Sequence, residues 1–296
     1  MHPNTPRAVI VSVHYKGPDS LLALLDSLRG ARELSEVAII IVDSCSGEEY
    51  LFGIRGKIAE IPNAELLESQ TNRGYFGAAR FALENYLKQG RALPDWVIVC
   101  NHDVLIEDKD FLEKLFAIDR ATAGVLAPRI RVLPGRVDQN PFMRQKPSWL
   151  RWASLQFIFS NYSLAKVWHW LARQKRRVKS QNWISGWNSS SNDSARPQQI
   201  YAPHGSFFIF SRRYFEAGGY LDGNLFLYGE EISVAEICRS LGVPVVYEPS
   251  LCVVHDEHRS TGKRISRFTF ECQKKALQYV TSRYLSGSRK PIDSAT

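Results

Sequence analysis

The chain has 296 residues, of which 44% are hydrophobic and 11% aromatic, and a formal net charge of +8 at pH 7. This length and composition support a substantial core and exclude an intrinsically disordered protein. No apolar run approaches the roughly 18 residues that a membrane-spanning helix needs, and the first one, 8–13, is too short for a signal-peptide core. The five cysteines lack CxxC spacing, so we expect a reduced, cytoplasmic chain.

Apolar segments that alternate between strand-like and helix-like spacing predict an α/β fold. A β-branched run at 8–13 precedes leucines at helical spacing from Leu21 to Leu28, and the run at 37–42 completes a β-α-β unit. Further strands are predicted at 64–67, 96–100, 124–127, 206–210, 243–247 and 251–254, and helices at 76–88, 111–118, 230–241 and 267–284. This order predicts a mostly parallel central sheet flanked by helices.

Composition marks 135–200 as a distinct helical insertion. Between Gln139 and Asn192 there is no Asp or Glu, while the same span holds nine Lys or Arg residues and six of the seven tryptophans. From 149 to 179 apolar and aromatic side chains precede a basic cluster, which is typical of a segment at an anionic membrane interface.

Two other interpretations of this insertion stay open. The tryptophans could pack on the rest of the domain and leave the basic residues solvated. Aromatic and basic residues together also bind single-stranded nucleic acid, but no recognised binding motif supports that partner. We therefore expect no nucleic-acid ligand.

Polar side chains follow two of the predicted strands. Asp103 closes the tripeptide Asn101-His102-Asp103 behind the apolar run 96–100, where open α/β sheets place their chemistry. A carboxylate there can hold a divalent cation, although Asn and Asp also punctuate turns. Asp43 follows the second strand and could accept hydrogen bonds from a base or a ribose, or cap a helix.

Three more segments carry candidate functional groups. A glycine-containing turn from Asn72 to Arg80 allows close approach to a ligand beside a helix N-terminus, without the GxGxxG pattern of dinucleotide-binding proteins. Glu230 and Glu231 begin a predicted helix, where acids also complement the helix dipole. His255 ends an apolar strand with further polar residues behind it, which is equally typical of a solvated loop.

The order of these motifs resembles the inverting family 2 glycosyltransferases, which have a GT-A fold. The resemblance covers Val9 to about Gly262. The matching segments are His14-Tyr15-Lys16, Asp43-Ser44-Cys45-Ser46, Asn72-Arg73-Gly74-Tyr75-Phe76-Gly77, Asn101-His102-Asp103, His204-Gly205-Ser206, Gly218-Gly219-Tyr220-Leu221-Asp222, Phe226-Leu227-Tyr228-Gly229-Glu230-Glu231 and 255–262. Several motifs in one order are far more specific than any single motif.

The resemblance implies a role for each segment. Asp43, Ser44, Asn72, Arg73, Gly74, Asn101 and Asp103 would bind the nucleotide sugar. Asp103, with His255, would hold Mg²⁺ or Mn²⁺. The family's general base is the second acid of a Glu-Asp pair; the equivalent here is Glu231, one methylene longer, so Glu230 stays open as the base. His204 and Gly205 would contact the acceptor, and His102 has no assigned role.

The implied function is inverting transfer of a sugar from a nucleoside-diphosphate sugar, dTDP-rhamnose or a UDP-hexose, to an oligosaccharide or lipid-linked acceptor in bacterial lipopolysaccharide or capsule synthesis. The expected units are a nucleotide-sugar-binding half (1–134), the insertion (135–200), an acceptor-side half (201–262) and a C-terminal helix and tail (263–296). The expected location is cytoplasmic, peripheral on the inner face of the membrane if the insertion binds lipid. The alternatives are an inactive sugar-nucleotide-binding relative and a non-catalytic peripheral membrane protein.

Overall fold

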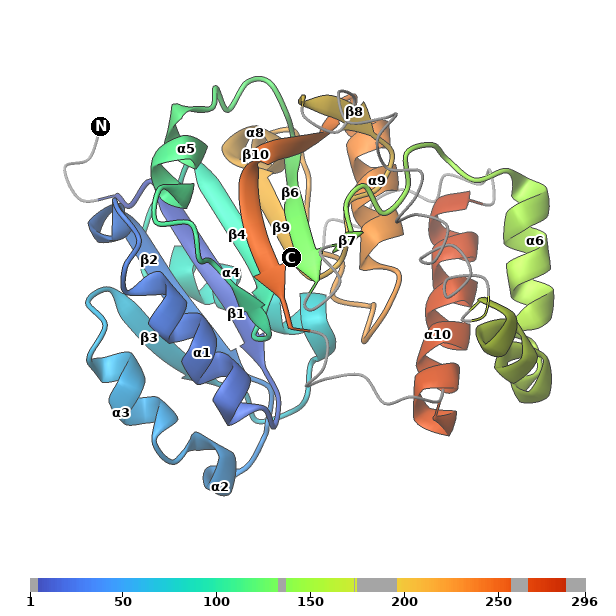
Figure 1. Cartoon of the computed structure of the whole chain (residues 1–296), viewed down its shortest axis with the longest axis horizontal. Helices are drawn as coiled ribbons and strands as arrows, with labels where there is room; N and C mark the ends of the chain where they lie inside the picture. Colours follow the sequence, from blue (N-terminus) through green and yellow to red (C-terminus); the bar gives the residue numbers. More distant parts are fainter. Residues whose placement is uncertain (1–4, 133–136, 173, 175–195, 257–265, 286–296) are drawn as a thin grey trace.

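A computed structural model describes residues 5–132, 137–172, 174, 196–256 and 266–285 (Figure 1). Within these residues ten strands form one sheet, in the order β3-β2-β1-β4-β9-β6-β10-β5, with β7 beside β6 and β8 beside β10. The strands are β1 (Ala8–His14), β2 (Val37–Asp43), β3 (Ala64–Glu68), β4 (Trp96–Asn101), β5 (Val104–Leu105), β6 (Val125–Val132), β7 (Val137–Asp138), β8 (Gln198–Ile200), β9 (Phe207–Ser211) and β10 (Val245–His255). The predicted α/β fold is confirmed.

Parallel pairing joins β3, β2, β1 and β4, and separately β6 and β10. The β-branched runs of β1 and β2 are buried on both faces, as expected for parallel strands covered by helices. The register sets His14 opposite Asp43 and Val13 opposite Asn101, so polar side chains from three strands end at one edge. This edge carries most of the candidate functional residues.

β9 runs antiparallel to both of its neighbours, β4 and β6. Its amino end therefore lies at the edge where β4 ends. β10 is one strand with a register shift between Glu248 and Cys252, whereas the sequence predicts two strands at 243–247 and 251–254. Pro249 lies inside this irregularity and lacks the N–H that a regular ladder needs, which accounts for a bulge within one strand.

Helices cover both faces of the sheet. α1 (Pro18–Leu28), α2 (Glu48–Leu51), α3 (Ile54–Ala59) and α5 (Phe111–Ala117) bury their apolar side chains in one core cluster. α4 (Gly74–Lys88), α8 (Arg212–Glu216) and α9 (Glu230–Leu241) pack into a second cluster on the other face. The short helices α2 and α3 are absent from the sequence prediction, because neither is long enough to show helical periodicity.

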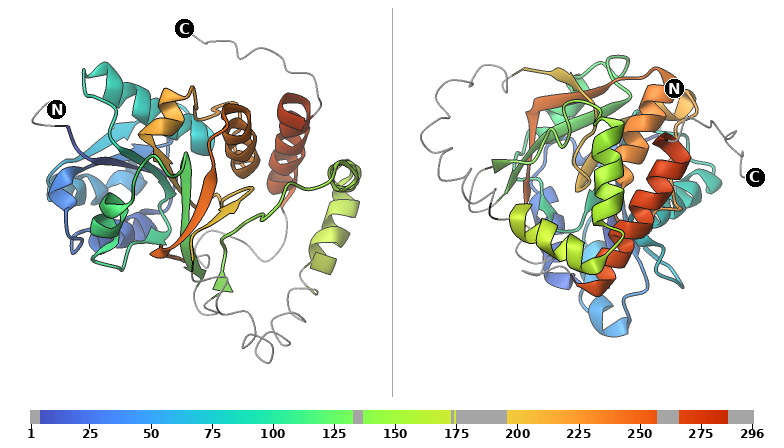
Figure 2. Two further views of the ribbon diagram at one scale, coloured as in Figure 1. Left: turned by 90° about the horizontal axis from the view of Figure 1, so that it is seen from above. Right: turned by 90° about the vertical axis from the view of Figure 1, so that its right-hand side faces the viewer.

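A third cluster lies beyond α9, where α6 (Trp149–Ile158) and α10 (Arg267–Val280) pack together. α6 continues into a helix at 162–172, and both form the outermost layer over α10 (Figure 2, right). A π-helical turn, Thr281–Leu285, follows α10. The hydroxyls of Tyr279 and Tyr284 donate to the buried Asp222 carboxylate at 3.0 Å and 2.6 Å, which attaches the end of α10 to the loop before α9.

Candidate active site

The end of β1 is joined to the end of β2 through His14 and Asp43. Nδ1–H of the fully buried His14 donates to Oδ1 of Asp43 at 2.9 Å, and the Gly17 N–H donates to Nε2 of His14 at 3.2 Å. The Ser46 N–H donates to Oδ2 of Asp43 at 3.0 Å. Burial would raise the pKa of Asp43, but the hydrogen bonds from His14 and Ser46 outweigh it and lower the pKa. Asp43 is therefore a fixed carboxylate at the strand end.

The glycine-containing turn lies beside this pair. The Arg73 N–H approaches Oγ of Ser44 at 3.4 Å, and Nε of Arg73 donates to Oγ of Ser69 at 2.9 Å. Oδ1 of the exposed Asn72 accepts the Gly74 N–H at 3.0 Å. Gly74 has φ +68°, and a Cβ there would lie 2.1 Å from the Phe226 carbonyl oxygen. This turn therefore needs glycine, because it packs directly against the loop that precedes α9.

Asp103 lies between β4 and β5, close to His255 at the end of β10. Oδ1 of Asp103 is 3.3 Å from Nε2 of His255, and both residues are buried. The Asp256 N–H donates to the Asp103 carbonyl at 2.9 Å, and β5 pairs with the end of β10. Two residues separated by about half of the sequence are thus placed side by side.

Gln139 orients the His255 ring. Nδ1–H of His255 donates a hydrogen bond to Oε1 of Gln139 at 2.8 Å, and the other ring nitrogen, Nε2, faces Asp103. A hydrogen bond at the second ring nitrogen is what a metal-ligating histidine normally has. The 3.3 Å separation of Asp103 and His255 is also close to the ~3.0 Å between adjacent ligands of an octahedral ion with 2.0–2.1 Å bonds.

This donor pair fits a divalent ion. Within the part of the chain that the structure describes, no group of three or more His, Cys, Asp or Glu side chains could hold a metal. Among the described residues, Asp103 and His255 are the two candidate ligands at this position.

The His102 ring contacts the end of β1 and the turn that follows it. Its Nδ1–H donates to the Val13 carbonyl at 3.0 Å, and its ring lies against Gly17, where a Cβ would be 2.4 Å from Nε2. Burial lowers its pKa. His102 is thus packed against the turn after β1.

The loop 204–206, which precedes β9, contacts both the strand ends and the start of α9. The Asn101 N–H donates to the Ser206 carbonyl at 2.9 Å, and the His204 ring lies 5.9 Å from the His255 ring. Nδ1 of His204 accepts the Ser206 N–H at 3.2 Å, and burial lowers the pKa of His204 to about 4. A Cβ on Gly205 would lie 2.6 Å from Oε1 of Glu231.

Glu230 and Glu231 begin α9 in different environments. Glu230 is 4% exposed, and its Oε1 has no hydrogen-bond partner among the described residues. Burial and the adjacent Glu231 charge raise the pKa of Glu230. Burial also raises the pKa of Glu231, against opposing backbone hydrogen bonds that include the Gly205 N–H. Glu231 is the more exposed of the two and faces the loop 204–206.

The predicted site residues thus form three neighbouring groups. The first group, at the ends of β1 and β2, is Asp43, Ser44 and Arg73. The second, at the ends of β4 and β10, is Asp103, His255 and His204. The third is Glu231, whose carboxylate lies against Gly205. The sequence predictions missed Gln139, which orients His255 without any local motif, and the bond from His14 to Asp43, which depends on strand register. The stretch after His255, 257–265, lies outside the described residues.

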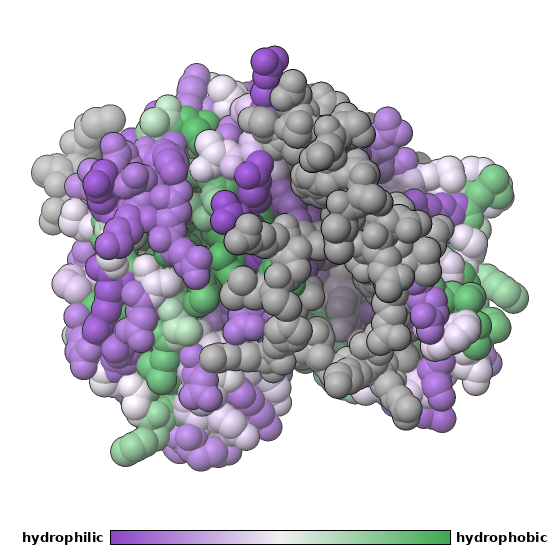
Figure 3. Space-filling model, in the orientation of Figure 1, coloured by the Kyte–Doolittle hydropathy of each residue, from purple (hydrophilic) through white to green (hydrophobic). Residues whose placement is uncertain are grey.

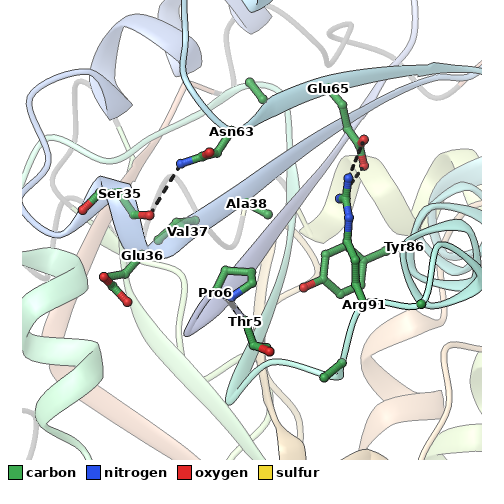
Figure 4. Close-up of a pocket in the computed structure, with 13 residues that line it drawn as sticks. Thr5, Pro6, Ser35, Glu36, Val37, Ala38, Asn63, Glu65, Tyr86 and Arg91 are labelled. Carbon is green, nitrogen blue, oxygen red and sulfur yellow. Dashed lines mark hydrogen bonds and ion pairs between the residues drawn. The ribbon is translucent and has the colours of Figure 1, made fainter. Parts of the chain in front are cut away.

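A separate cavity lies at the opposite ends of the parallel strands (Figure 4). It is lined by the start of β2, by Asn63 and Glu65 at the start of β3, and by the segment after α4, which includes Arg91. Arg91 and Glu65 form an ion pair there, 3.3 Å between Nη1 and Oε1. This cavity shares no residue with the candidate active site.

The sequence matches one protein family over most of its length. The profile described as "Glycosyl transferase family 2" aligns with residues 8–219. The chain belongs to glycosyl transferase family 2. The resemblance drawn from its motifs is confirmed, and the protein is a glycosyltransferase.

This glycosyltransferase is similar to a curated relative and to solved structures. It is 27% identical over 289 residues, covering 96% of this chain and 87% of the relative, to N-acetylglucosaminyl-diphospho-decaprenol L-rhamnosyltransferase of Mycobacterium tuberculosis. Among solved structures, the mannosyltransferase PcManGT from Pyrobaculum calidifontis, in complex with GDP-Man and Mn²⁺, aligns with a TM-score of 0.52 at 14% identity, over 95% of this chain and 74% of that one. S. aureus TarS aligns with a TM-score of 0.52 at 14% identity, over 96% and 73%. The glycosyltransferase has the GT-A fold.

Proposed function

We propose that this glycosyltransferase moves a sugar from a nucleoside-diphosphate sugar to a lipid-linked glycan acceptor with inversion, in the synthesis of a bacterial surface polysaccharide. The observation that carries the proposal is the set of contacts of the loop 204–206, which touches Glu231 through Gly205, Asn101 through Ser206 and His255 through His204. A proton acceptor and a candidate metal pair thus surround one loop. An inverting displacement needs both, one for the acceptor hydroxyl and one for the leaving diphosphate.

Glu231 is the proposed general base. Its carboxylate is the more exposed of the pair and is held by backbone N–H groups that stabilise the charged form. Glu230 is buried, its Oε1 has no hydrogen-bond partner in the part of the chain that the structure describes, and its pKa is raised by burial and by the charge of Glu231. A group buried in this way is neutral more readily than its neighbour, so Glu230 supports the site while Glu231 accepts the proton.

Asp103 and His255 are the proposed ligands of Mg²⁺ or Mn²⁺. A divalent ion there supplies positive charge to a departing diphosphate. The PcManGT structure contains Mn²⁺ together with GDP-Man. Gln139 keeps the Nε2 lone pair of His255 directed at Asp103, and Asn101 lies on the same strand end to contact the ribose or a phosphate.

The nucleoside is assigned to the ends of β1 and β2. Both oxygens of Asp43 already accept protein hydrogen bonds, so Asp43 would contact a base through its remaining lone pairs. Ser44, Asn72, Arg73 and Gly74 line the neighbouring turn. His204 and Gly205 are assigned to the acceptor because they lie between Glu231 and His255.

The mycobacterial relative supports a proposal for the donor and the acceptor. The mycobacterial relative is a rhamnosyltransferase whose name specifies a diphospho-decaprenol acceptor, which favours dTDP-rhamnose over a UDP-hexose and a lipid-linked acceptor over a free oligosaccharide. No described helix is long and apolar enough to cross a membrane. The proposed location is the inner face of the cytoplasmic membrane, with peripheral attachment.

Sugar transfer by paired variants tests the proposal. With dTDP-rhamnose, Mn²⁺ and a short-chain N-acetylglucosaminyl diphospholipid, Glu231→Gln should lower kcat by about 10²- to 10⁴-fold, while Glu230→Gln should retain most of it. The reverse result would make Glu230 the base. Wild-type protein that neither transfers sugar nor hydrolyses any of the nucleotide sugars tested would instead indicate an inactive relative.

A further inference from the structure

The two helices of the insertion turn apolar side chains toward solvent. On α6 the exposed side chains include Trp149, which is 74% exposed, Leu150 and Phe157, which is 69% exposed. On the following helix Leu164, Val167, Trp168 and Leu171 are all exposed and recur at spacings of three and four residues. A stripe with this spacing covers one helix face. A surface helix of a globular protein normally directs such a stripe at the core.

The opposite sides of the same helices already face the protein. Trp152 and Leu155 of α6 belong to the cluster that contains Ala276 and Val280 of α10, and Ala165 of the second helix is fully buried. The helices therefore already bury one apolar face against the protein, and the exposed stripes form a second apolar surface. Apolar surface gathers along the right-hand edge of Figure 3, where these helices lie in Figure 1.

The charged side chains of these two helices are basic. Arg151 and Lys166 are exposed on the two helices, and Arg267 at the start of α10 lies over the Tyr162 ring, 5.0 Å from its centroid. The sequence contains no Asp or Glu between Gln139 and Asn192. The basic cluster at 175–179 belongs to this acid-free span but lies outside the described residues.

We propose that α6 and the helix 162–172 form a docking platform for an anionic lipid bilayer, an inference that rests on the proposed lipid-linked acceptor. Trp and Phe side chains together with Lys and Arg match the interface between headgroups and acyl chains, where indole rings and basic groups are both favourable. A second copy of the chain is a poorer occupant, because it would bring an equally acid-free, cationic surface against this one. Anionic lipid complements both the apolar stripes and the charge.

The platform shares an apolar cluster with α9, the element that carries the proposed base. Its cluster includes Leu225, Ile232 and Ala235, from α9 and the loop before it. Phe268 of α10 also meets Phe226, with ring centroids 6.3 Å apart. A bilayer bound at the platform would therefore lie on the α9 side of the molecule, where a lipid-linked acceptor has to approach Glu231.

Vesicle co-sedimentation tests the platform directly. The full chain is mixed with vesicles of phosphatidylcholine containing about 30% phosphatidylglycerol, or with phosphatidylcholine alone, in 0.15 M salt. The platform variant carries Trp149→Ser, Phe157→Ser and Trp168→Ser; the control is Phe52→Ser, a 91% exposed side chain at the end of α2 on the far side of the sheet. Because binding strength scales with the apolar area inserted, the platform variant should bind anionic vesicles at least about tenfold more weakly, and the control should bind like wild type.

Two controls separate this inference from the proposed function. All variants should keep the wild-type Tm, since the substituted side chains are exposed, and the platform variant should keep wild-type turnover on a water-soluble short-chain acceptor. Absence of turnover in every form would defeat the proposed function while leaving the vesicle result intact. Wild-type protein that does not bind anionic vesicles, or a platform variant that binds as tightly, would overturn the platform. A wild-type dimer that the platform variant converts to a monomer, without a change in vesicle binding, would assign the surface to a second copy.

Discussion

At the scale of single residues, Glu230 and Glu231 set the expected response to pH. Burial raises the pKa of both carboxyls above the ordinary 4.5. A general base acts only when deprotonated, so kcat/KM should rise with pH through a limb that lies above pH 4.5. Glu231→Gln should remove the limb together with most of the activity. A limb at or below pH 4.5 in wild type would contradict a buried carboxylate base.

The same burial predicts a pH-dependent stability. A folded state that raises the pKa of Glu230 binds its proton more tightly than the unfolded chain does, so stability falls as pH rises from about 4.5 toward the folded pKa. Above that pKa the cost of the buried charge is fully present. Glu230→Gln should therefore gain Tm relative to wild type as the pH rises from 5 to 8, measured by scanning calorimetry. A constant difference across this range would show that Glu230 ionises normally.

Gln139 should affect metal binding without entering the reaction. Its Oε1 fixes the His255 ring, and loss of such a partner typically costs about 10- to 100-fold in metal affinity. Titration calorimetry of Mn²⁺ in the presence of nucleoside diphosphate should show this loss for Gln139→Ala. Gln145→Ala is the matched control, because Gln145 is an exposed glutamine of the same segment of the chain. Equal affinities in both variants would remove Gln139 from the site.

At the scale of elements, Gly74 joins the nucleotide-side turn to the loop before α9. Gly74→Ala would introduce both a positive φ for alanine and a collision with the Phe226 carbonyl. Gly53 has φ +84° with open space around its missing Cβ, so Gly53→Ala carries only the backbone strain, of order 1–3 kcal/mol. Gly74→Ala should lower the free energy of unfolding beyond that of Gly53→Ala, measured by urea denaturation. Equal losses of unfolding free energy in the two variants would mean that the loop 222–229 moves to accommodate the added methyl group without cost.

The attachment of α10 depends on a buried carboxylate. Asp222 accepts from Tyr279, Tyr284 and the Asn224 N–H. Hydrogen bonds to charged groups contribute about 1.5–3 kcal/mol each, so Tyr284→Phe should destabilise the chain by that order and speed amide exchange in α10. Tyr15→Phe, an exposed tyrosine, should change neither. Exchange in α10 that stays at the wild-type rate would place its stability in the apolar cluster alone.

At the scale of the whole molecule, the sequence was most informative where chemistry and periodicity coincide. β2 ends on Asp43, β4 ends one residue beyond the predicted segment on Asn101, and α9 begins at Glu230 as predicted, because β-branched runs and helical spacing are local properties. The bond from His14 to Asp43, the ring contact of His204 with His255 and the role of Gln139 depend on register and on chain reversal. Register and chain reversal are set by packing between distant segments, so no local sequence pattern predicts these contacts.

Ligand binding should stabilise the whole chain through two separable contributions, one from the nucleotide sugar and one from the metal. A donor at 100 times its dissociation constant raises stability by about 2.7 kcal/mol, and a metal bound through Asp103 and His255 should add to it. A thermal-shift panel of nucleotide sugars, with and without Mn²⁺, measures both. Asp103→Asn should keep the metal-independent shift and lose the remainder. A full Mn²⁺ response in that variant would place the metal elsewhere.

The reversed direction of β9 decides where chemistry has to be sought in this sheet. For a parallel strand, functional side chains lie at its last residue or just beyond it, as Asp43 and Asp103 do. β9 runs the other way, so the segment that reaches the same edge comes before its first residue, and that segment is His204-Gly205-Ser206. In related sheets, functional positions at this edge should therefore be sought just before the first residue of an antiparallel strand and at or just after the last residue of a parallel strand.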